Sequence, residues 1–253
     1  MFRVFSCLTG EHDWRLVMLA GFVCLLASLV AISLFHRARA TRARARSRHA
    51  WLLLAGAATG CGIWATHFIA MLAYEPSIPV AYNIGLTVAS LAVAMALTIA
   101  GLSVAMSGRA RWAAAIGGAI VGGGIACMHY LGMSAVELPG QITWVWYLVI
   151  ISVIGGMLFG MAALALAVRR DNIRGTAIAA LLLTLAIVSH HFIAMGAVEI
   201  VPDPTRVINA FSLSPTSLAL AIAGAAFGIL LSTTSVMWFE RFLMRYARPW
   251  GAG

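Results

Sequence analysis

Three histidines in the sequence are each followed by a methionine four residues later and by a glutamate eight residues later. They form the sets His67, Met71 and Glu75; His129, Met133 and Glu137; and His191, Met195 and Glu199. Soft thioether sulfur favours Cu(I), and imidazole serves both oxidation states of copper. Zinc seldom uses thioethers, and calcium or magnesium would need oxygen donors. The residue types therefore predict a copper site.

The residues around each histidine form one repeated signature. It aligns without gaps over 63–75, 125–137 and 187–199, so successive histidines are 62 residues apart. In each copy an aromatic residue follows the histidine, and a branched aliphatic residue comes next. Residues i and i+4 share a face of a helix, so each copy presents one imidazole and one thioether together. One histidine alone could equally be a hydrogen-bonding link between helices, but three copies in one register favour a shared functional site.

The segments that carry the signatures belong to a membrane protein. The 253 residues are 62% apolar and 10% charged, and the mean hydropathy is +0.95. Uncharged stretches long enough to cross a bilayer recur along the chain. They are expected at 16–35, 51–73, 84–106, 113–135, 145–168, 176–198 and 216–238. Because each 62-residue unit holds two crossings, the predicted fold is an all-α polytopic bundle of seven transmembrane helices with three parallel two-helix repeats.

The arginines predict how the bundle is oriented. All 17 basic residues are arginine, and most lie in alternate connections, with six of them in the segment 37–48. By the positive-inside rule the amino terminus is outside and the carboxyl terminus is cytoplasmic, as expected for a multi-pass protein of the bacterial inner membrane. The signatures then lie near the outer face. The net charge of +9 is explained by this asymmetry and by contact with anionic lipid, so it does not indicate nucleic acid.

Several residues near the signatures have more than one interpretation. Met128 and His190, directly before two of the histidines, are candidate additional ligands. The three glutamates are interpreted first as interfacial acids and second as a gate, proton acceptors or partners of the histidines. His12 is expected to be solvated, with a role as a further ligand as the alternative. The cysteines show no CxxC spacing and do not indicate a disulfide scaffold.

The segment Met128-His129-Tyr130 resembles the signature of the MHYT-domain family of bacterial membrane sensors, named after a Met-His-Tyr-Thr motif. The resemblance covers about 12–203 as a six-helix sensor domain, followed by a seventh helix and a short tail at 204–253. It implies that the histidines and methionines hold copper that senses oxygen, carbon monoxide or nitric oxide. Leu131 replaces the motif threonine, and the other two copies depart further from the four-letter motif.

Three functions are compared. The first is a non-enzymatic sensor that signals through a separate output protein, because only about fifteen residues follow the seventh helix and no nucleophile, nucleotide loop or carboxylate pair appears. The second is a membrane redox protein that binds haem through its histidines. The third is a copper or proton permease, which is disfavoured because the inner halves of the expected helices contain no ionisable residue.

Overall fold

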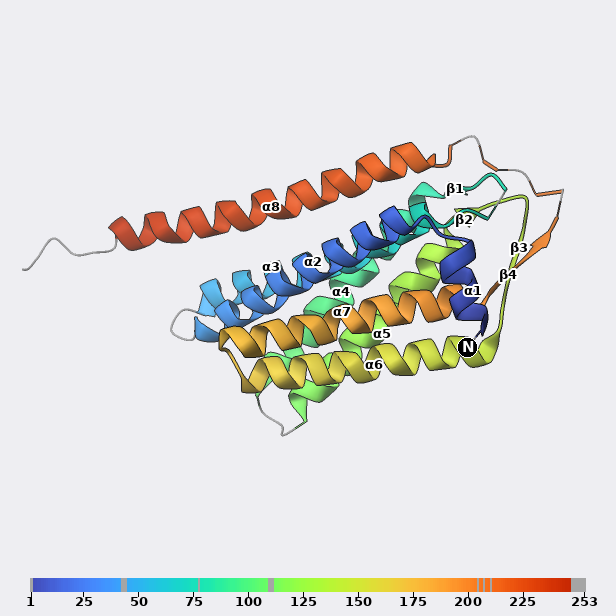
Figure 1. Cartoon of the computed structure of the whole chain (residues 1–253). Coiled ribbons are helices and arrows are strands. Elements are labelled where there is room, and N and C mark those ends of the chain that lie inside the picture. Colours follow the sequence, from blue (N-terminus) through green and yellow to red (C-terminus); the bar gives the residue numbers. More distant parts are fainter. Residues whose placement is uncertain are drawn as a thin grey trace, which may run out of the picture.

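The structure, a computed structural model, describes residues 2–41, 45–76, 78–108, 112–203, 205–206, 208–209 and 211–246. These residues form eight helices (Figure 1). Their bounds are α1 Phe2–Gly10, α2 Trp14–Ala40, α3 Ala45–Ala73, α4 Ile84–Ser107, α5 Ala113–Ser134, α6 Trp146–Arg169, α7 Ile173–Met195 and α8 Pro215–Tyr246. Seven of them are long and apolar enough to cross a membrane, which confirms the predicted seven-span bundle and a multi-pass membrane protein.

Side-chain caps explain where several of these helices begin. Asp13 accepts a hydrogen bond from the backbone nitrogen of Arg15 at the start of α2. Asn83 and Asn172 cap α4 and α7 in the same way. Such caps satisfy backbone donors that have no partner inside the helix.

Helices α2 to α7 form the bundle, and α8 lies on its outside against α3. Neighbouring helices run in opposite directions, so α3, α5 and α7 all end on the same side (Figure 1). This side also carries α1 and all the strands, and we call it the hairpin end. The signatures lie near this end, because each falls in the last turns of its helix.

Arginines mark the opposite end of the bundle. Arg37 and Arg39 lie in the last turn of α2, and Arg169 ends α6. Other arginines of the predicted charge asymmetry, namely Arg42, Arg44, Arg109, Arg111 and Arg248, lie outside the described residues.

The strands and α1 were not predicted. β1 (Ala81–Tyr82) pairs with β2 (Val136–Glu137), and β3 (Gly140–Trp144) pairs with β4 (Val198–Pro202), both antiparallel. The prediction that one helix runs to residue 198 was therefore wrong at its end. α7 stops at Met195, and Val198 is already in β4, where β-branched residues favour the extended backbone.

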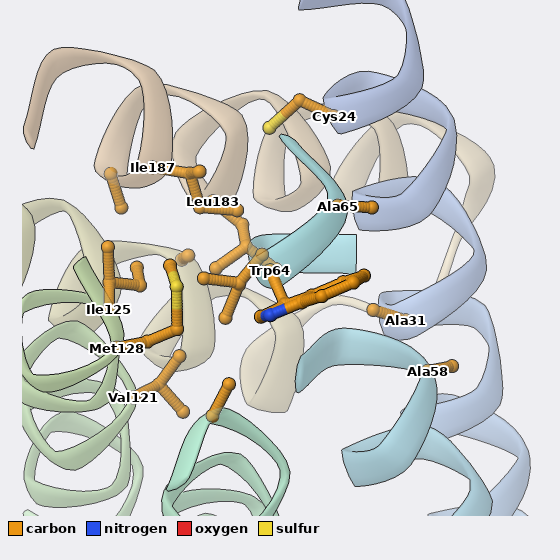
Figure 2. Packing of buried hydrophobic residues seen from close by; sticks show 14 of the residues in the cluster. Cys24, Ala31, Ala58, Trp64, Ala65, Val121, Ile125, Met128, Leu183 and Ile187 are labelled. Carbon is orange, nitrogen blue, oxygen red and sulfur yellow. The ribbon is translucent and has the colours of Figure 1, made fainter. Parts of the chain in front are cut away.

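The interior of the bundle is apolar between the histidines and the arginine-rich end. Trp64 of α3, Met128 of α5 and Leu183 of α7 converge there (Figure 2), and all three are buried. Glycines allow close packing nearby: a Cβ on Gly118 of α5 would lie 2.3 Å from the carbonyl oxygen of Gly160 in α6. The apolar side chains pack the three signature helices together, and the glycine contact sets α5 against α6.

Candidate metal centre

The structure brings the three signature histidines together in the interior of the bundle. His67, His129 and His191 come from α3, α5 and α7, and their exposed fractions are 1%, 1% and 3%. Each offers a ring nitrogen such that the three nitrogens lie within 4.8 Å of one another. The prediction that the constant spacing places them at similar depth around a shared interior is confirmed.

Two of the three distances between the imidazole nitrogens are those of ligands to one ion. The Nδ1 of His67 lies 3.2 Å from the Nδ1 of His129 and 3.2 Å from the Nδ1 of His191. Two nitrogens bound at about 2.0 Å in tetrahedral directions would be about 3.3 Å apart. Three imidazole nitrogens in this arrangement leave a further coordination position for a small ligand.

Hydrogen bonds between the rings cannot satisfy this cluster. The Nδ1 of a neutral imidazole carries either one proton or one lone pair, so His67 can form a hydrogen bond with only one of its two neighbours at a time. The Nε2 atoms of all three rings are buried without a partner in the described part of the chain. Buried polar groups left without partners are costly, about 1–3 kcal/mol each. A cation between the three Nδ1 atoms would take three lone pairs at once, with the ring protons on the Nε2 atoms, so it resolves the competition at Nδ1 and the donor set fits one.

The aromatic residue after each histidine packs against its ring. The centroids of His67 and Phe68 are 4.6 Å apart, and the rings meet edge to face. The pairs His129–Tyr130 and His191–Phe192 repeat this arrangement at 5.0 Å. The repeated aromatic position therefore holds each imidazole in place, which the sequence pattern alone did not explain.

Gly132 provides the space for the ring of His67. A Cβ at this position would lie 2.6 Å from Nε2 of His67 and 3.0 Å from its Cδ2. The other copies have Ala70 and Ala194 here, so a small residue three positions after each histidine was the signal that could have revealed this contact.

The signature methionines lie one helical turn closer to the hairpin end than the histidines. Met71, Met133 and Met195 are all buried. Met133 borders a cavity of about 530 Å³, and Met195 borders another of about 290 Å³. The histidines are the group that the structure places at ligand distance, and coordination by the methionines stays a prediction.

The two candidate additional ligands lie in different surroundings. Met128 packs in the apolar centre beside Trp64 (Figure 2). His190 is buried with its ring centroid 5.2 Å from that of His129 and 5.8 Å from that of Tyr130. Among the described residues neither ring nitrogen of His190 has a hydrogen-bond partner. Of the two, His190 is therefore better placed to act as an additional metal ligand.

The prediction that each glutamate lies at the end of its helix was wrong. All three lie in the segments that follow the helices. Glu137 in β2 accepts hydrogen bonds from the Ser212 hydroxyl, the Asn209 backbone nitrogen and the Asn83 amide. These bonds, that of Ser212 first, lower the pKa of the Glu137 carboxyl. Glu199 in β4 forms an ion pair with Arg3.

The remaining glutamate lies between helices at the hairpin end. The backbone nitrogen of Glu75 donates to the carbonyl oxygen of Glu11. The glutamates thus lie against three different segments of the chain, and a role for them as ligands stays a prediction.

His12 is buried, so the expectation that it is solvated was wrong. Its exposed fraction is 8%, and its ring packs against Tyr74 and Phe192. The short segment between α1 and α2 folds it inward, where its Nδ1 donates to the carbonyl oxygen of Cys7 at 2.9 Å. Burial lowers the pKa of His12.

Comparison with known proteins agrees with this site and fold. The sequence profile of the MHYT family, described as a bacterial signalling protein N-terminal repeat, matches residues 60–118 and 122–180. The chain belongs to the MHYT-domain family. Each matched copy begins within a signature helix and includes the next helix, and the third signature follows the second match.

Curated relatives are bacterial signalling proteins. A signalling protein of Caulobacter vibrioides is 37% identical over 98% of this chain and 30% of its own length. The bifunctional diguanylate cyclase/cyclic di-GMP phosphodiesterase MucR of Pseudomonas aeruginosa is 34% identical over 76% of this chain and 29% of its own. The cyclic di-GMP phosphodiesterase NbdA of the same organism is 32% identical over 72% and 24%.

The chain thus spans less than a third of these relatives. No solved structure matches it.

Proposed function

We propose that this protein is a non-enzymatic membrane sensor in which His67, His129 and His191 hold a copper ion that binds a diatomic gas. The observation that carries the proposal is the pair of 3.2 Å distances from the Nδ1 of His67 to the other two imidazoles in a buried site. Copper held by imidazole can take oxygen, carbon monoxide or nitric oxide at its open position. A small uncharged ligand suits a site enclosed by apolar helices, because it loses little solvation on entry.

The same geometry favours copper over haem. Two axial ligands of haem iron bind on opposite faces of a macrocycle, about 4 Å apart at bond lengths of about 2.0 Å. Here the imidazoles are closer than that, and Phe68, Tyr130 and Phe192 pack directly against them. This packing leaves no slot for a macrocycle between the rings.

A permease is also disfavoured by the packing around the site. On the side away from the hairpin end the three signature helices bury the apolar side chains Trp64, Met128 and Leu183 between them (Figure 2). An ion leaving in that direction would meet apolar side chains, where its desolvation is not compensated. The site is built to hold a ligand near one face.

The signal is proposed to leave through α8. Phe68, next to His67, packs edge to face on Tyr82 with centroids 5.9 Å apart. Tyr82 pairs through its backbone with Leu213, two residues before α8 begins, and Glu137 bonds Ser212 in the same segment. A ligand that prefers one arrangement of α3 and α5 would thereby shift the start of α8. A separate output protein at the cytoplasmic side would read the shift.

The hairpin end is proposed to face the periplasm, because the arginines gather at the other end. The exposed apolar side chains of the helices, such as Met18, Phe22 and Leu158, would then contact lipid. Reporter fusions test this orientation: a periplasm-active reporter should work at 78–80 and fail after residue 246. The reverse pattern would contradict it.

Infrared spectroscopy of the Cu(I)-loaded protein under carbon monoxide tests the gas-binding proposal. The wild type should show the stretching band of copper-bound carbon monoxide, and His67→Ala should not. A copper-loaded protein without a band for carbon monoxide or nitric oxide, and without a spectral change with oxygen, would overturn gas sensing. An intense Soret absorption in the purified protein would instead indicate haem.

A further inference from the structure

His190 is a buried polar residue that lies beside the histidine site. It directly precedes His191 in α7, and its exposed fraction is 1%. Its ring meets the ring of His129 edge to face, with the centroids 5.2 Å apart. The rings of His129 and His191 are separated by the same 5.2 Å. His190 therefore contacts the site as closely as the signature imidazoles contact one another.

The other two copies of the signature show that the fold does not need a histidine at this position. Thr66 occupies the equivalent place in α3, and its hydroxyl donates to the Gly62 carbonyl of the same helix. Met128 occupies it in α5 and packs in the apolar interior. His190 instead brings two ring nitrogens into the interior, and neither has a hydrogen-bond partner among the described residues. Such unpartnered groups destabilise a folded protein, so a structural role does not explain this residue.

The surroundings of His190 leave its proton uncommitted. The Ser152 hydroxyl donates to the Val149 carbonyl at 2.8 Å, so the Tyr130 hydroxyl, 3.0 Å from it, is the donor of that pair. The carbonyl of Ser152 approaches the ring of His190 but does not reach hydrogen-bonding geometry. Either nitrogen of the neutral ring can therefore carry the proton, and the ring has one N–H to donate.

The other aromatic rings that pack on the histidine site have no hydrogen-bond donor to spare. Phe68 and Phe192 have no polar side-chain atom, and the O–H of Tyr130 is already bonded to Ser152. Among the ring contacts of the described residues, His190 is thus the one that can donate to a molecule held between the three imidazoles.

A hydrogen-bond donor beside a metal distinguishes between diatomic gases. Oxygen and nitric oxide draw electron density from an electron-rich ion such as Cu(I), and carbon monoxide draws less. Hydrogen bonds to a group that carries negative charge are about twice as strong as those to a neutral group. At haem iron, the polarity and the donors of the pocket likewise decide how a gas is bound.

We propose that His190 is the specificity-determining residue of the histidine site, where it donates a hydrogen bond to the bound gas and favours oxygen and nitric oxide over carbon monoxide. The inference rests on the proposed gas-binding copper site. The three ring nitrogens that lie within 4.8 Å of one another belong to the signature histidines and not to His190. His190 is therefore assigned to the gas and not to the metal, and it acts as a neutral ring.

Infrared spectroscopy of the Cu(I)-loaded full chain in nanodiscs under carbon monoxide tests the hydrogen bond. His190→Met introduces the residue of the second copy and removes the N–H, whereas His190→Gln keeps a donor. Even a weak hydrogen bond lowers the carbon monoxide stretching frequency, so the band should move to higher frequency in His190→Met and stay near the wild-type position in His190→Gln. Without oxygen present, displacement of carbon monoxide by nitric oxide should need at least ~10-fold more nitric oxide in His190→Met.

Thr66→Val is the matched control, because it removes the polar group at the same position of the first copy. Its band and its displacement by nitric oxide should match those of the wild type. Wild-type behaviour in His190→Met would overturn the hydrogen bond, and loss of copper from this variant would overturn it by showing that His190 is a ligand. A wild type that binds no copper or no carbon monoxide would contradict the proposed function itself, and this inference with it.

Thermal unfolding of the metal-free protein separates this role from a structural one. Methionine at position 190 replaces an unpartnered polar ring with an apolar side chain, so the unfolding temperature of His190→Met should rise by about 2 °C or more. A lower unfolding temperature in His190→Met, with no such decrease in Thr66→Val, would show that the ring stabilises the fold and would overturn the assignment.

Discussion

Tyr82 and Leu213 exchange two backbone hydrogen bonds, with N···O distances of 3.0 and 2.7 Å. This pair joins the segment before α4 to the segment before α8, which are more than a hundred residues apart in the chain. The ring of Tyr82 also lies against Phe68, beside the first signature histidine. The histidine site and the outermost helix are therefore connected through one residue.

Removing one of these bonds should loosen the start of α8. Leu213→Pro deletes the N–H that donates to the Tyr82 carbonyl, a loss of about 0.5–1.5 kcal/mol. We expect faster amide hydrogen exchange at 211–218, whereas Tyr82→Phe, which removes only the long 3.4 Å bond to the Met71 carbonyl, should change it little. Unchanged exchange in Leu213→Pro would show that the pair does not hold α8.

The hydrogen bonds of Glu137 predict that amide hydrogen exchange in the segment before α8 depends on pH. Hydrogen bonds from Ser212 and its neighbours lower the pKa of this carboxyl from 4.5. A group with a lowered folded-state pKa contributes stability above its unfolded pKa and loses it as pH falls through the folded value. Exchange at 208–213 should therefore stay slow at neutral pH and rise in acid below the ordinary pKa of a glutamate.

Substitutions test whether Glu137 is the group that causes this pH dependence of hydrogen exchange. Glu137→Gln should show fast exchange already at neutral pH, because the neutral amide accepts weaker hydrogen bonds than a carboxylate. Glu75→Gln, in the first copy, serves as the control. If exchange in Glu137→Gln still rises in acid as in the wild type, another residue causes the pH dependence.

Gly132→Ala should disturb the imidazole cluster directly. The added methyl group would meet Nε2 of His67 at 2.6 Å, and overpacking of this kind costs about 1–3 kcal/mol. Thermal unfolding and copper affinity should both fall. Gly123→Ala on the same helix is the matched control, since a Cβ there meets nothing within 4 Å.

The repeated signature was sufficient to predict much of the site. A constant spacing over three parallel helices places His67, His129 and His191 at one depth, so their meeting followed from the sequence and helix geometry. The hydrophobic stretches likewise predicted the seven spans, because apolar length is the dominant signal in a membrane.

Contacts between distant segments could not be predicted in this way. The burial of His12 depends on how α1 folds over α7, and the role of Glu137 depends on the segment before α8. Short strands such as β1 and β2 have too few residues to leave a period in the sequence, and their pairing is decided by the helices that bring them together.

Copper content of the purified protein, compared between wild type, His129→Ala and Met157→Leu, tests the central claim most directly. His129→Ala removes one of the three clustered imidazoles. Loss of a residue that only hydrogen-bonds a metal ligand typically costs ~10–100-fold in metal affinity, so loss of a ligand itself should reduce Cu(I) affinity by at least that much. Met157 lies on α6 in an apolar groove against α5, so its replacement should leave binding nearly unchanged. We predict one copper at the histidine site in wild type and Met157→Leu and its loss in His129→Ala. Equal copper in all three proteins, or none in a wild type supplied with Cu(I), would contradict a copper centre at these histidines.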